Sequence, residues 1–546
     1  MLRAVATRLG ILGAMAFLHL SAITYSVAAP SFADALTNGT INISGLSEAS
    51  GVAASRNNDN VLWVHNDSGN PAVVYAIDTQ GRFLAKYNLP GNIDNEDIAI
   101  GPGPVANVSY LYVGDIGDNS ADRTGSSTIR VYQIPEPLVY TTQFTNPVTR
   151  TPKGSRTVFL SYPDGPRNAE SMFVDPVTGD LFILSKESTS RVYTATKAQM
   201  DANSSNVLTF VRSLSFTTPS GADISAAGNE IVVRRESFAQ LWKRTSGQTI
   251  SSALGGTPIT IPVTGTANGE PNGEGIGFDA VGRGYFTVSD NASTQPLRYF
   301  ARTSSDGPPA QKALVQPGST WSFLDNGTDQ GTAWRDSLFN DSAWSTGSAQ
   351  FGYGEGDEKT IVHSNRSTIY FRKSFNVSEP ASITNLVLKL LVDDGAAVFL
   401  NGAPICYYHV ISNAVYSTLA TQQPVNLQDT WLSFPVAPSK LTNGVNTLAV
   451  EVHQASLTSS NLSFDLQLVA TCNQTNAPAL IMAPVGNAMK LCWPASAAGY
   501  FLEEKGALDP GSGWNMSAAQ TYIWSDHFFI TNLSLLGTRF YRLHHP

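Results

Sequence analysis

Charged side chains are scarce in this chain of 546 residues. Asp, Glu, Lys and Arg fill only 14% of its positions, whereas roughly a quarter is usual for soluble proteins. Lys and Arg total 34 against 43 Asp and Glu, for a net charge of -9. Binding to phosphate-rich partners needs a concentrated basic face, and no such cluster occurs. The composition therefore excludes nucleic acid as a partner, and the abundant Asn, Ser, Thr and Gly favour β-sheets with polar faces.

Cysteine and the common catalytic motifs are also lacking. The chain has only Cys406, Cys472 and Cys492, too few for a disulfide framework. Cys472 and Cys492 either pair or serve as small core residues. No G-x-S-x-G motif marks a nucleophilic serine, and His65 has no His or Cys at zinc-ligand spacing. A serine hydrolase and a zinc enzyme are both disfavoured.

Long apolar runs are absent except at the N-terminus. Arg3 and Arg8 precede the run "LGILGAMAFLHLSAITYSVAA", and small residues follow it. This pattern predicts a signal peptide over residues 1–33, with Ser31 and Ala33 as the cleavage pair; a membrane anchor is the alternative. No later run can span a bilayer as a helix, so we expect a secreted, periplasmic or cell-surface protein with no transmembrane helix after signal removal.

A four-strand pattern recurs about every fifty residues. An acid leads into a first strand, a second apolar strand ends in polar residues, and two more strands follow. The second strands read "VLWVHNDSGN", "LYVGDIGDN", "LFILSKES", "EIVVRRES" and "GYFTVSDNAS". Such repeats are the signature of a β-propeller. Five copies predict a five-bladed propeller over residues 38–305, in which "TINISG" from residue 40 supplies the last outer strand. A sixth, degenerate blade near residues 135–160 is the alternative.

Propeller geometry gathers polar side chains at one end. In each blade the first strand begins at the same end of the propeller at which the second strand finishes, so the polar residues of both lie on one face. Binding sites are commonly found in the loops on one face of a rigid scaffold. The candidate catalytic residues are Glu96, Glu170 and Glu274. The candidate binding residues are Glu48, His65, Asn66, Asp67, Arg167, Lys186, Glu187, Asp223, Arg235 and Asp290, and Arg234 is also placed on this rim.

Clustered carboxylates repel one another unless a cation or raised pKa values relieve them. Carboxylate and amide oxygens suit Ca²⁺, and "GDIGDN" supplies Asp115 and Asp118 beside Asp97 as candidate metal ligands. The segment lacks the spacing of an EF-hand loop, so Ca²⁺ is the candidate cofactor and no cofactor is the alternative. Paired carboxylates could alternatively hydrolyse a glycosidic bond, one acting as the acid and the other as the base or nucleophile.

Residues 40–305 resemble secreted bacterial propellers of unassigned activity through "LWVHNDSG", "LYVGDIGDN" and "YPDGPRNAE". Acids at the heads of inner strands are also similar in arrangement to the five-bladed arabinanases and levansucrases. That similarity is architectural and implies no transfer of roles to individual residues.

After a Pro-rich linker at 306–317, residues 318–470 resemble the galactose-binding-like jelly roll appended to many secreted glycosidases. The resemblance lies in "WRDSLFNDSAWSTGSAQFGYG", "LVDDGAAVFLNGAPI" and "GVNTLAVEVHQ". Asp393, Asp394 and Asn401 are its candidate binding residues, with a turn role as the alternative, and Trp334 and Trp344 are expected in the core.

Residues 476–546, through "KLCWPASAAGYFLEEKGAL" and "RFYRLHHP", resemble a small fibronectin- or immunoglobulin-like β-sandwich. The sequence thus predicts an all-β, three-part exported protein that binds glycan, Ca²⁺ or both, with a polysaccharide or glycoconjugate as partner. An extracellular hydrolase is the alternative, and the oligomeric state stays open.

Overall fold

The computed structural model describes residues 29–123, 128–202, 204–265, 269–270, 272–290, 294–304, 306–422, 427–472, 480–485, 488–494, 500–506, 514–517, 519, 521–524, 527–533 and 539–544. The fold is nearly all β, as the sequence predicts, and its short helices include α1 (Lys197–Asp201) and α2 (Ile250–Ala253). No helix in these described stretches is long and apolar enough to cross a membrane.

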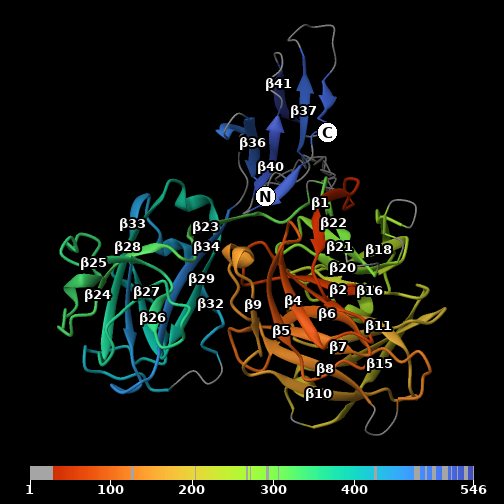
Figure 1. Cartoon of the computed structure of the whole chain (residues 1–546), viewed down its shortest axis with the longest axis horizontal. Coiled ribbons are helices and arrows are strands. Elements are labelled where there is room, and N and C mark those ends of the chain that lie inside the picture. Colours follow the sequence, from red (N-terminus) through yellow and green to blue (C-terminus); the bar gives the residue numbers. More distant parts are fainter. Residues whose placement is uncertain are drawn as a thin grey trace, which may run out of the picture.

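Five mainly antiparallel sheets occupy residues 36–301 (Figure 1). The first contains β2 (Ala49–Ala54), β3 (Val61–Asn66), β4 (Val73–Asp78), β5 (Phe83–Asn88) and β9 (Val148–Arg150). The second contains β6 (Asn95–Pro102), β7 (Ser109–Asp115), β8 (Ile129–Pro135), β10 (Arg156–Ser161) and β14 (Asn206–Val207). The third contains β11 (Ala169–Val174), β12 (Leu181–Ser185), β13 (Ser190–Ala195) and β15 (Thr209–Leu214). The fourth contains β16 (Gly221–Ile224), β17 (Glu230–Arg235), β18 (Phe238–Lys243) and β19 (Ile259–Ile261). The fifth contains β20 (Gly273–Phe278), β21 (Gly284–Ser289), β22 (Thr294–Ala301) and β1 (Leu36–Asn42).

The first strands of the five sheets pack in a closed circle, which we call the ring. β2 contacts β6, β6 contacts β11, β11 contacts β16, β16 contacts β20, and β20 contacts β2. Small residues permit this close approach. A Cβ at Gly51 would lie 2.6 Å from His65 Nε2, and one at Gly277 would lie 2.3 Å from Val52 O. Glycine is therefore required where neighbouring strands meet at the axis.

The outer strand of the fifth sheet is β1, which comes from the N-terminal end of residues 36–301. β1 pairs antiparallel with β22, with Leu36 opposite Tyr299 and Asn42 opposite Thr294. Ahead of it, Phe32 forms a bridge with Arg302 and its ring packs on Tyr285. The expected leader lies outside the described residues up to position 28, and its cleavage after Ala33 stays a prediction.

Residues 135–160, all of them described, form no sheet of their own. β9 pairs parallel with β5 at the edge of the first sheet, and β10 pairs with β8 as the fourth strand of the second. The 3-10 helix η2 (Thr141–Thr145) lies between them. The extra length of the second repeat is therefore used to extend a neighbouring sheet.

Two further sheets form a sandwich beside the ring (Figure 1). One contains β27 (Thr360–Ile361), β26 (Phe351–Tyr353), β34 (Leu462–Cys472), β29 (Ile383–Asp393), β32 (Leu432–Val436) and β23 (Ala310–Val315). The other contains β25 (Ser345–Ser348), β24 (Thr320–Leu324), β28 (Thr368–Val377), β33 (Gly444–His453), β30 (Gly395–Leu400) and β31 (Ala403–Tyr408). β23 falls inside the stretch expected to be a linker, where flanking prolines and glycine mask the short strand "AQKALV".

Trp334 is completely buried, and its ring packs edge-on against Tyr370. Trp344 is half-buried and contacts the same tyrosine. The expected core role is confirmed for Trp334, and Trp344 packs at the core's margin.

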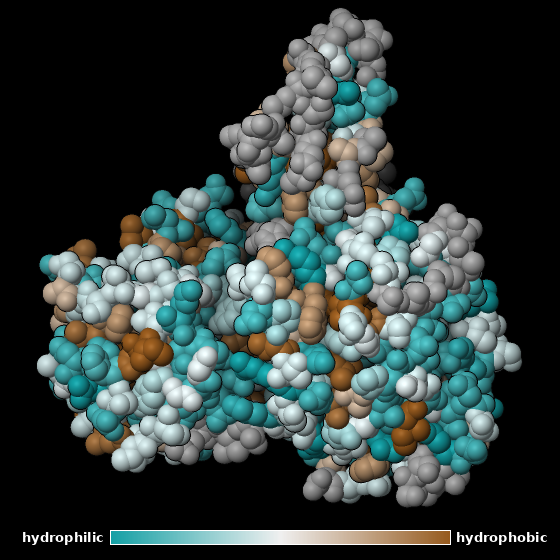
Figure 2. Space-filling model, viewed as in Figure 1, coloured by the Kyte–Doolittle hydropathy of each residue, from teal (hydrophilic) through white to brown (hydrophobic). Residues whose placement is uncertain are grey.

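The C-terminal strands form two small sheets above the junction of ring and sandwich (Figure 1). They are β35 (Ile481–Val485), β36 (Ala488–Pro494), β40 (His527–Leu533) and β39 (Tyr522–Trp524), and separately β38 (Asn515–Met516), β37 (Phe501–Lys505) and β41 (Phe540–His544). All three cysteines are free thiols, so Cys472 and Cys492 do not pair. The face shown in Figure 2 is mostly hydrophilic, with scattered apolar residues.

Candidate binding site at the mouth of the ring

The end of the ring where its strands begin, here called the mouth, carries a recurring β-bulge. The pairing register shifts between Ala49 and Gly51, between Asn95 and Asp97, between Ala169 and Ser171, and between Gly273 and Ile276. Bulges add an unpaired residue and re-aim its side chain, and they are common beside active sites. The side chains set at these bulges are Ser50, Glu96, Glu170 and Glu274.

A hydroxyl links these bulge residues around the ring. Ser50 Oγ donates to the backbone oxygen of Glu96 at 2.7 Å and to Glu274 Oε2 at 3.1 Å. On the other side, Glu170 forms an ion pair with Lys186 and accepts from Asn168 Nδ2 at 3.4 Å. The three predicted catalytic glutamates therefore come together at one end of the ring.

Three carboxylates at the mouth form a tight group, here called the acid trio. Asp67, Asp94 and Glu96 each place an oxygen within 4.8 Å of the others. Glu96 is 3% exposed, whereas the two aspartates are half-buried. Among the described residues, no Lys, Arg or His nitrogen lies within 4.0 Å of these carboxylates. The trio offers oxygen ligands of the kind that Ca²⁺ uses.

The pKa values of several carboxyl groups at the mouth are raised. Burial, and next the charge of Glu170, raise the pKa of Glu96 well above its ordinary value. Burial, and next the charge of Glu170, raise the pKa of Glu274 to about 8. Burial and the charges of Glu48 and Asp67 raise the pKa of Asp290 to about 6. Like charges thus face one another in a partly dehydrated site.

Asp94 was not among the site residues predicted from the sequence, because it lies just before β6, which begins at Asn95. Its backbone N–H donates to Asp115 Oδ1 at 3.1 Å, and Ile93 N donates to Asp115 Oδ2 at 3.2 Å. Asp115 is itself paired with Arg123 and Arg130. A predicted metal ligand therefore positions the loop that carries Asp94, while its own carboxylate is already neutralised.

Asp97 and Asp118 also differ from their predicted role as metal ligands. Side chains alternate along a strand, so Asp97 turns away from Glu96 and is completely buried. Its carboxylate accepts from Met172 N at 2.8 Å and Ala222 N at 3.1 Å, joining the second, third and fourth sheets. Asp118 accepts from the backbone of Asp122 and Arg123. The three predicted ligands do not converge on one point.

Asp223 occupies the same position in its strand as Asp97, the third, and not the second position that Glu96, Glu170 and Glu274 occupy. It is buried and accepts from Phe278 N at 2.8 Å, so it ties the fourth sheet to the fifth. The residue equivalent to Glu170 in that sheet is Ala222. Glu48 likewise lies two residues before Ser50, at the rim, where it accepts from Asn70. Matching acids by sequence alone placed both in the wrong register.

Other predicted rim residues serve the fold. His65 is fully buried, and burial lowers its pKa from 6.5 to about 4. Asn66 Oδ1 accepts from Ser47 N and Glu48 N at 3.0 and 3.1 Å. Arg234 is completely buried and pairs with Glu270 at 3.0 Å. None of these three side chains presents a free polar group at the rim.

Arg167 and Glu187 lie outside the acid trio. Arg167 pairs with Glu187 at 2.7 Å and with Asp164 at 2.8 Å, and Arg235 is exposed, with its guanidinium 5.4 Å from the centre of the Phe238 ring. Lys186 stands as the cation nearest to the glutamates, through its pair with Glu170.

The sandwich holds a second, smaller acidic pocket. Asp393 and Asp394 line a cavity of about 310 Å³ together with Asn461, and burial, with Asp394 next, raises the pKa of Asp393 to about 8. Asn401 lies at the far end of β30, where its amide bonds Lys440 O, Asn446 Oδ1 and Thr447 N. Its φ of 51° and these bonds give it the turn role.

Neither a protein-family model nor a curated protein matches this sequence. Among solved structures, the chain is similar to an auxiliary nutrient binding protein from Bacteroides thetaiotaomicron, at 12% identity and a TM-score of 0.29, covering 49% of this chain and 76% of that one. It is similar to a nidogen/laminin complex chain, at 12% identity and a TM-score of 0.27, covering 44% and 73%. A Bacteroides uniformis β-glucuronidase matches at 17% identity and a TM-score of 0.21, covering 43% of this chain and 27% of that enzyme. Likenesses this weak carry no argument about function.

Proposed function

We propose that residues 36–301 form a five-bladed β-propeller, followed by a galactose-binding-like jelly roll and a fibronectin-like module. The closed circle of five first strands supports five blades. The pairing of β1 with β22 supports closure of the last blade by the N-terminal strand. Closure of this kind removes the exposed edges that open sheets leave.

The function that the mouth supports best is binding of a divalent cation, Ca²⁺, together with a glycan. The acid trio carries this proposal, because its three carboxylates have no ion-pair partner within 4.0 Å among the described residues, and a cation or protons would relieve their repulsion. Asp67, Asp94 and Glu96 are the direct ligands. Ca²⁺ takes six to eight oxygens, so water and sugar hydroxyls complete its shell.

The surroundings of the trio suit a sugar. Asn70, Asn92 and Asn168 lie half-buried around the mouth, and amides both donate and accept hydrogen bonds. Lys186 and Glu170 add a fixed ion pair at the rim. The resemblance of the sandwich to accessory domains of glycosidases points to the same class of partner.

The test uses the whole chain and two variants, Asp67→Asn and Glu96→Gln. Calorimetric titration with Ca²⁺ should give one site in the parent protein and at least about tenfold weaker binding in each variant, since each loses a charged ligand. Asp122→Asn is the matched control, because Asp122 is exposed on the loop after β7 and lies outside the trio. Equal Ca²⁺ binding by all four proteins would refute the site.

A glycan array, run with and without chelator, tests the second half of the proposal. Sugar retained only with Ca²⁺ supports a cation-bridged glycan. Sugar retained equally in chelator places glycan binding elsewhere on the chain.

One observation favours a hydrolase as the second candidate. Glu274, with its pKa raised to about 8, is protonated at neutral pH, as a general acid must be. Burial raises the pKa of Glu170, and its ion pair with Lys186 partly offsets that effect, so the Lys186 ammonium is placed to stabilise the carboxylate form of this partner. Prolonged incubation of any retained glycan should then release product, and Glu274→Gln should abolish the release without loss of binding.

We further propose that the protein is exported through the N-terminal leader. N-terminal sequencing of the protein recovered from its producing cells would locate the cleavage site, and a retained Met1 would refute processing.

A further inference from the structure

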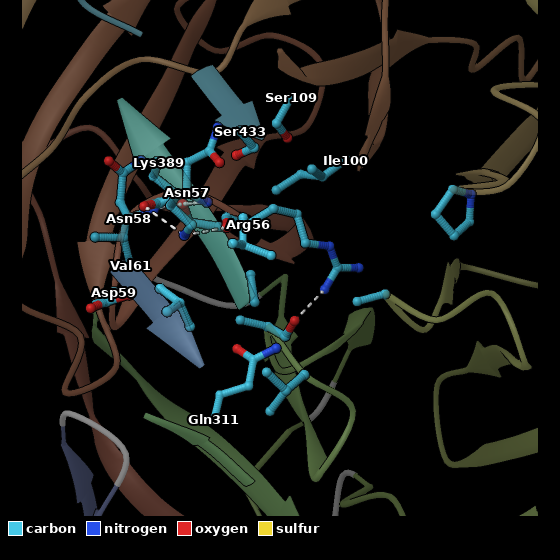
Figure 3. A pocket seen from close by; sticks show the side chains of 18 of the residues that line it. Arg56, Asn57, Asn58, Asp59, Val61, Ile100, Ser109, Gln311, Lys389 and Ser433 are labelled. Carbon is cyan, nitrogen blue, oxygen red and sulfur yellow. Dashed lines mark hydrogen bonds between the residues drawn. The ribbon is translucent and has the colours of Figure 1, made fainter. Parts of the chain in front are cut away.

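A cavity of about 720 Å³ lies between the ring, the sandwich and the C-terminal strands. Its walls come from the turns between the first and second strands of all five sheets, from β23, β29, β32 and β34, and from Ile523. Figure 3 shows Asn57 and Asn58 of the first such turn beside Lys389 of the sandwich, with Gln311 on another part of the wall. We call this cavity the chamber. Its volume lies within the range of about 300 to 1,000 Å³ that is common for small-molecule sites.

The chamber is distinct from the mouth. The mouth lies where the first strands begin, and the chamber lies at the turns where they end. Strands of about six residues separate the two by roughly 20 Å. Occupation of the chamber therefore needs neither the acid trio nor the glutamates at the bulges.

Basic residues outnumber acidic ones in the lining. Arg56, Lys197, Arg283, Lys312 and Lys389 face Asp59 and Asp279, five against two, a formal excess of three positive charges. The chain as a whole carries -9. The chamber lining thus has an excess of basic residues in a protein whose net charge is negative.

Two of these cations have only carbonyl partners. Lys389 Nζ donates to Arg56 O at 2.9 Å and to Asn57 O at 3.3 Å, which leaves one of its three N–H groups without an acceptor among the described residues. The Arg56 guanidinium donates to Ala280 O at 3.1 Å and Ile224 O at 3.3 Å. Within the described part of the chain, no carboxylate oxygen lies within 4.0 Å of either side chain. Of the two acids that line the chamber, Asp59 accepts from Gln467 Nε2 at 2.8 Å, and Asp279 meets Arg56 only through its backbone oxygen, at 3.5 Å.

A third donor in the lining is unsatisfied. Asn57 is 4% exposed, and its Nδ2 has no hydrogen-bond acceptor among the described residues. Buried donors without acceptors are costly and are normally satisfied by water or ligand. Asn57 and Lys389 lie side by side (Figure 3), and Lys389 Nζ donates to the backbone oxygen of Asn57 at 3.3 Å, so both residues belong to the same part of the lining.

The remaining walls are apolar. Val61, Ile100, Pro102, Val105, Val387 and Val469 line the chamber. An occupant must therefore combine an anionic head, which the basic donors hold, with a body that buries apolar surface.

We propose that the chamber binds a small amphipathic carboxylate, whose carboxylate accepts from Lys389 Nζ and Asn57 Nδ2 and whose apolar body lies against the valine and proline walls. The carboxylate supplies a directly bonded anion, which Lys389 lacks among the described residues, where Nζ donates only to carbonyl oxygens. The ligand contacts both the ring and the sandwich, so its binding couples to their docking.

Octanoate is the probe, and its neutral isostere octanamide is the matched comparison. Isothermal titration of the full chain should show one octanoate per chain and at least about tenfold weaker binding of octanamide, because the charge-assisted bonds are lost. Equal binding of the two, or no binding of octanoate, would overturn the proposal.

Variants locate the site. Lys389→Met should weaken octanoate binding by about tenfold or more. Lys153→Met is the control, since Lys153 also bridges ring and sandwich, through Asp429 at 3.4 Å and Glu355 at 3.9 Å, but does not line the chamber. If circular dichroism shows that Lys389→Met is unfolded, Asn57→Asp is used instead. It should weaken octanoate binding, because it places a negative charge beside the negatively charged ligand. Octanoate affinity unchanged in the folded variant would overturn the site.

Discussion

Replacement of Glu274 by Gln should change how stability depends on pH. Burial and the charge of Glu170 raise the pKa of Glu274 from 4.5 to about 8. Between these two values the folded protein holds a proton that the unfolded chain has released. The free energy of unfolding therefore falls as pH rises through this window. Gln carries no titratable proton, so the variant lacks this contribution.

The expected magnitude follows from the shift. A change of 8 minus 4.5, or 3.5 pKa units, corresponds to about 5 kcal/mol once Glu274 is fully ionised, at about 1.36 kcal/mol per unit. At pH 5 the parent and Glu274→Gln should unfold with similar free energies. At pH 9 the variant should be more stable by up to about 5 kcal/mol. Ca²⁺ should narrow that gap, because a cation at the acid trio offsets the same repulsion.

Urea unfolding at pH 5, 7 and 9, in chelator and in Ca²⁺, measures this difference. Subtraction of the parent from the variant removes the titration of shared groups far from Glu274. The titration of Glu96 and Lys186, which the charge of Glu274 influences, remains part of the measured difference. A difference that stays flat from pH 5 to pH 9, or a parent that is the more stable at pH 9, would refute the reasoning. Either result would mean that the Glu274 carboxyl group is well hydrated and that its pKa in the folded protein is close to its value in the unfolded chain.

Three further substitutions separate structural residues from the mouth. Asp97→Ala removes a buried acceptor shared by Met172 N and Ala222 N; urea unfolding should show a loss of about 2–4 kcal/mol. Glu270→Gln breaks the fully buried pair with Arg234 and should cost about 3–5 kcal/mol, also by urea unfolding. Trp334→Ala empties a buried site in the sandwich; calorimetry should show a loss of about 3–5 kcal/mol with Ca²⁺ titration unchanged. An unchanged stability in any of the three would contradict its assigned role.

The sequence predicted the sheets well because their signals are local. Each second strand is a short apolar run with polar ends, and these runs became β3, β7, β12, β17 and β21. Repetition supplied the rest, since "TINISG" could be matched to an outer strand only by its position in the cycle. Its first three residues, Thr40 to Asn42, form the end of β1, beside β22.

The site was predicted only in part because register is not local. The glutamates at 96, 170 and 274 share one position in their strands, and repetition found them. Asp97 and Asp223 fall one residue later, where alternation turns a side chain to the opposite face. Asp94 precedes its strand and reaches the trio only because Asp115 holds the preceding loop. The chamber had no sequence signal, because its walls come from three separate parts of the chain.

The pairing of β1 with β22 sets the order in which the molecule can be assembled. Leu36 meets Tyr299, so a strand made early must wait, unpaired, for one made more than 250 residues later. Contacts between such distant positions are slow to form. Until Tyr299 arrives, the first four sheets have no fifth neighbour and the first and fourth keep an open flank. The full ring can thus close only once the chain has been made through Ala301, and a truncation anywhere before β22 should yield an aggregation-prone fragment.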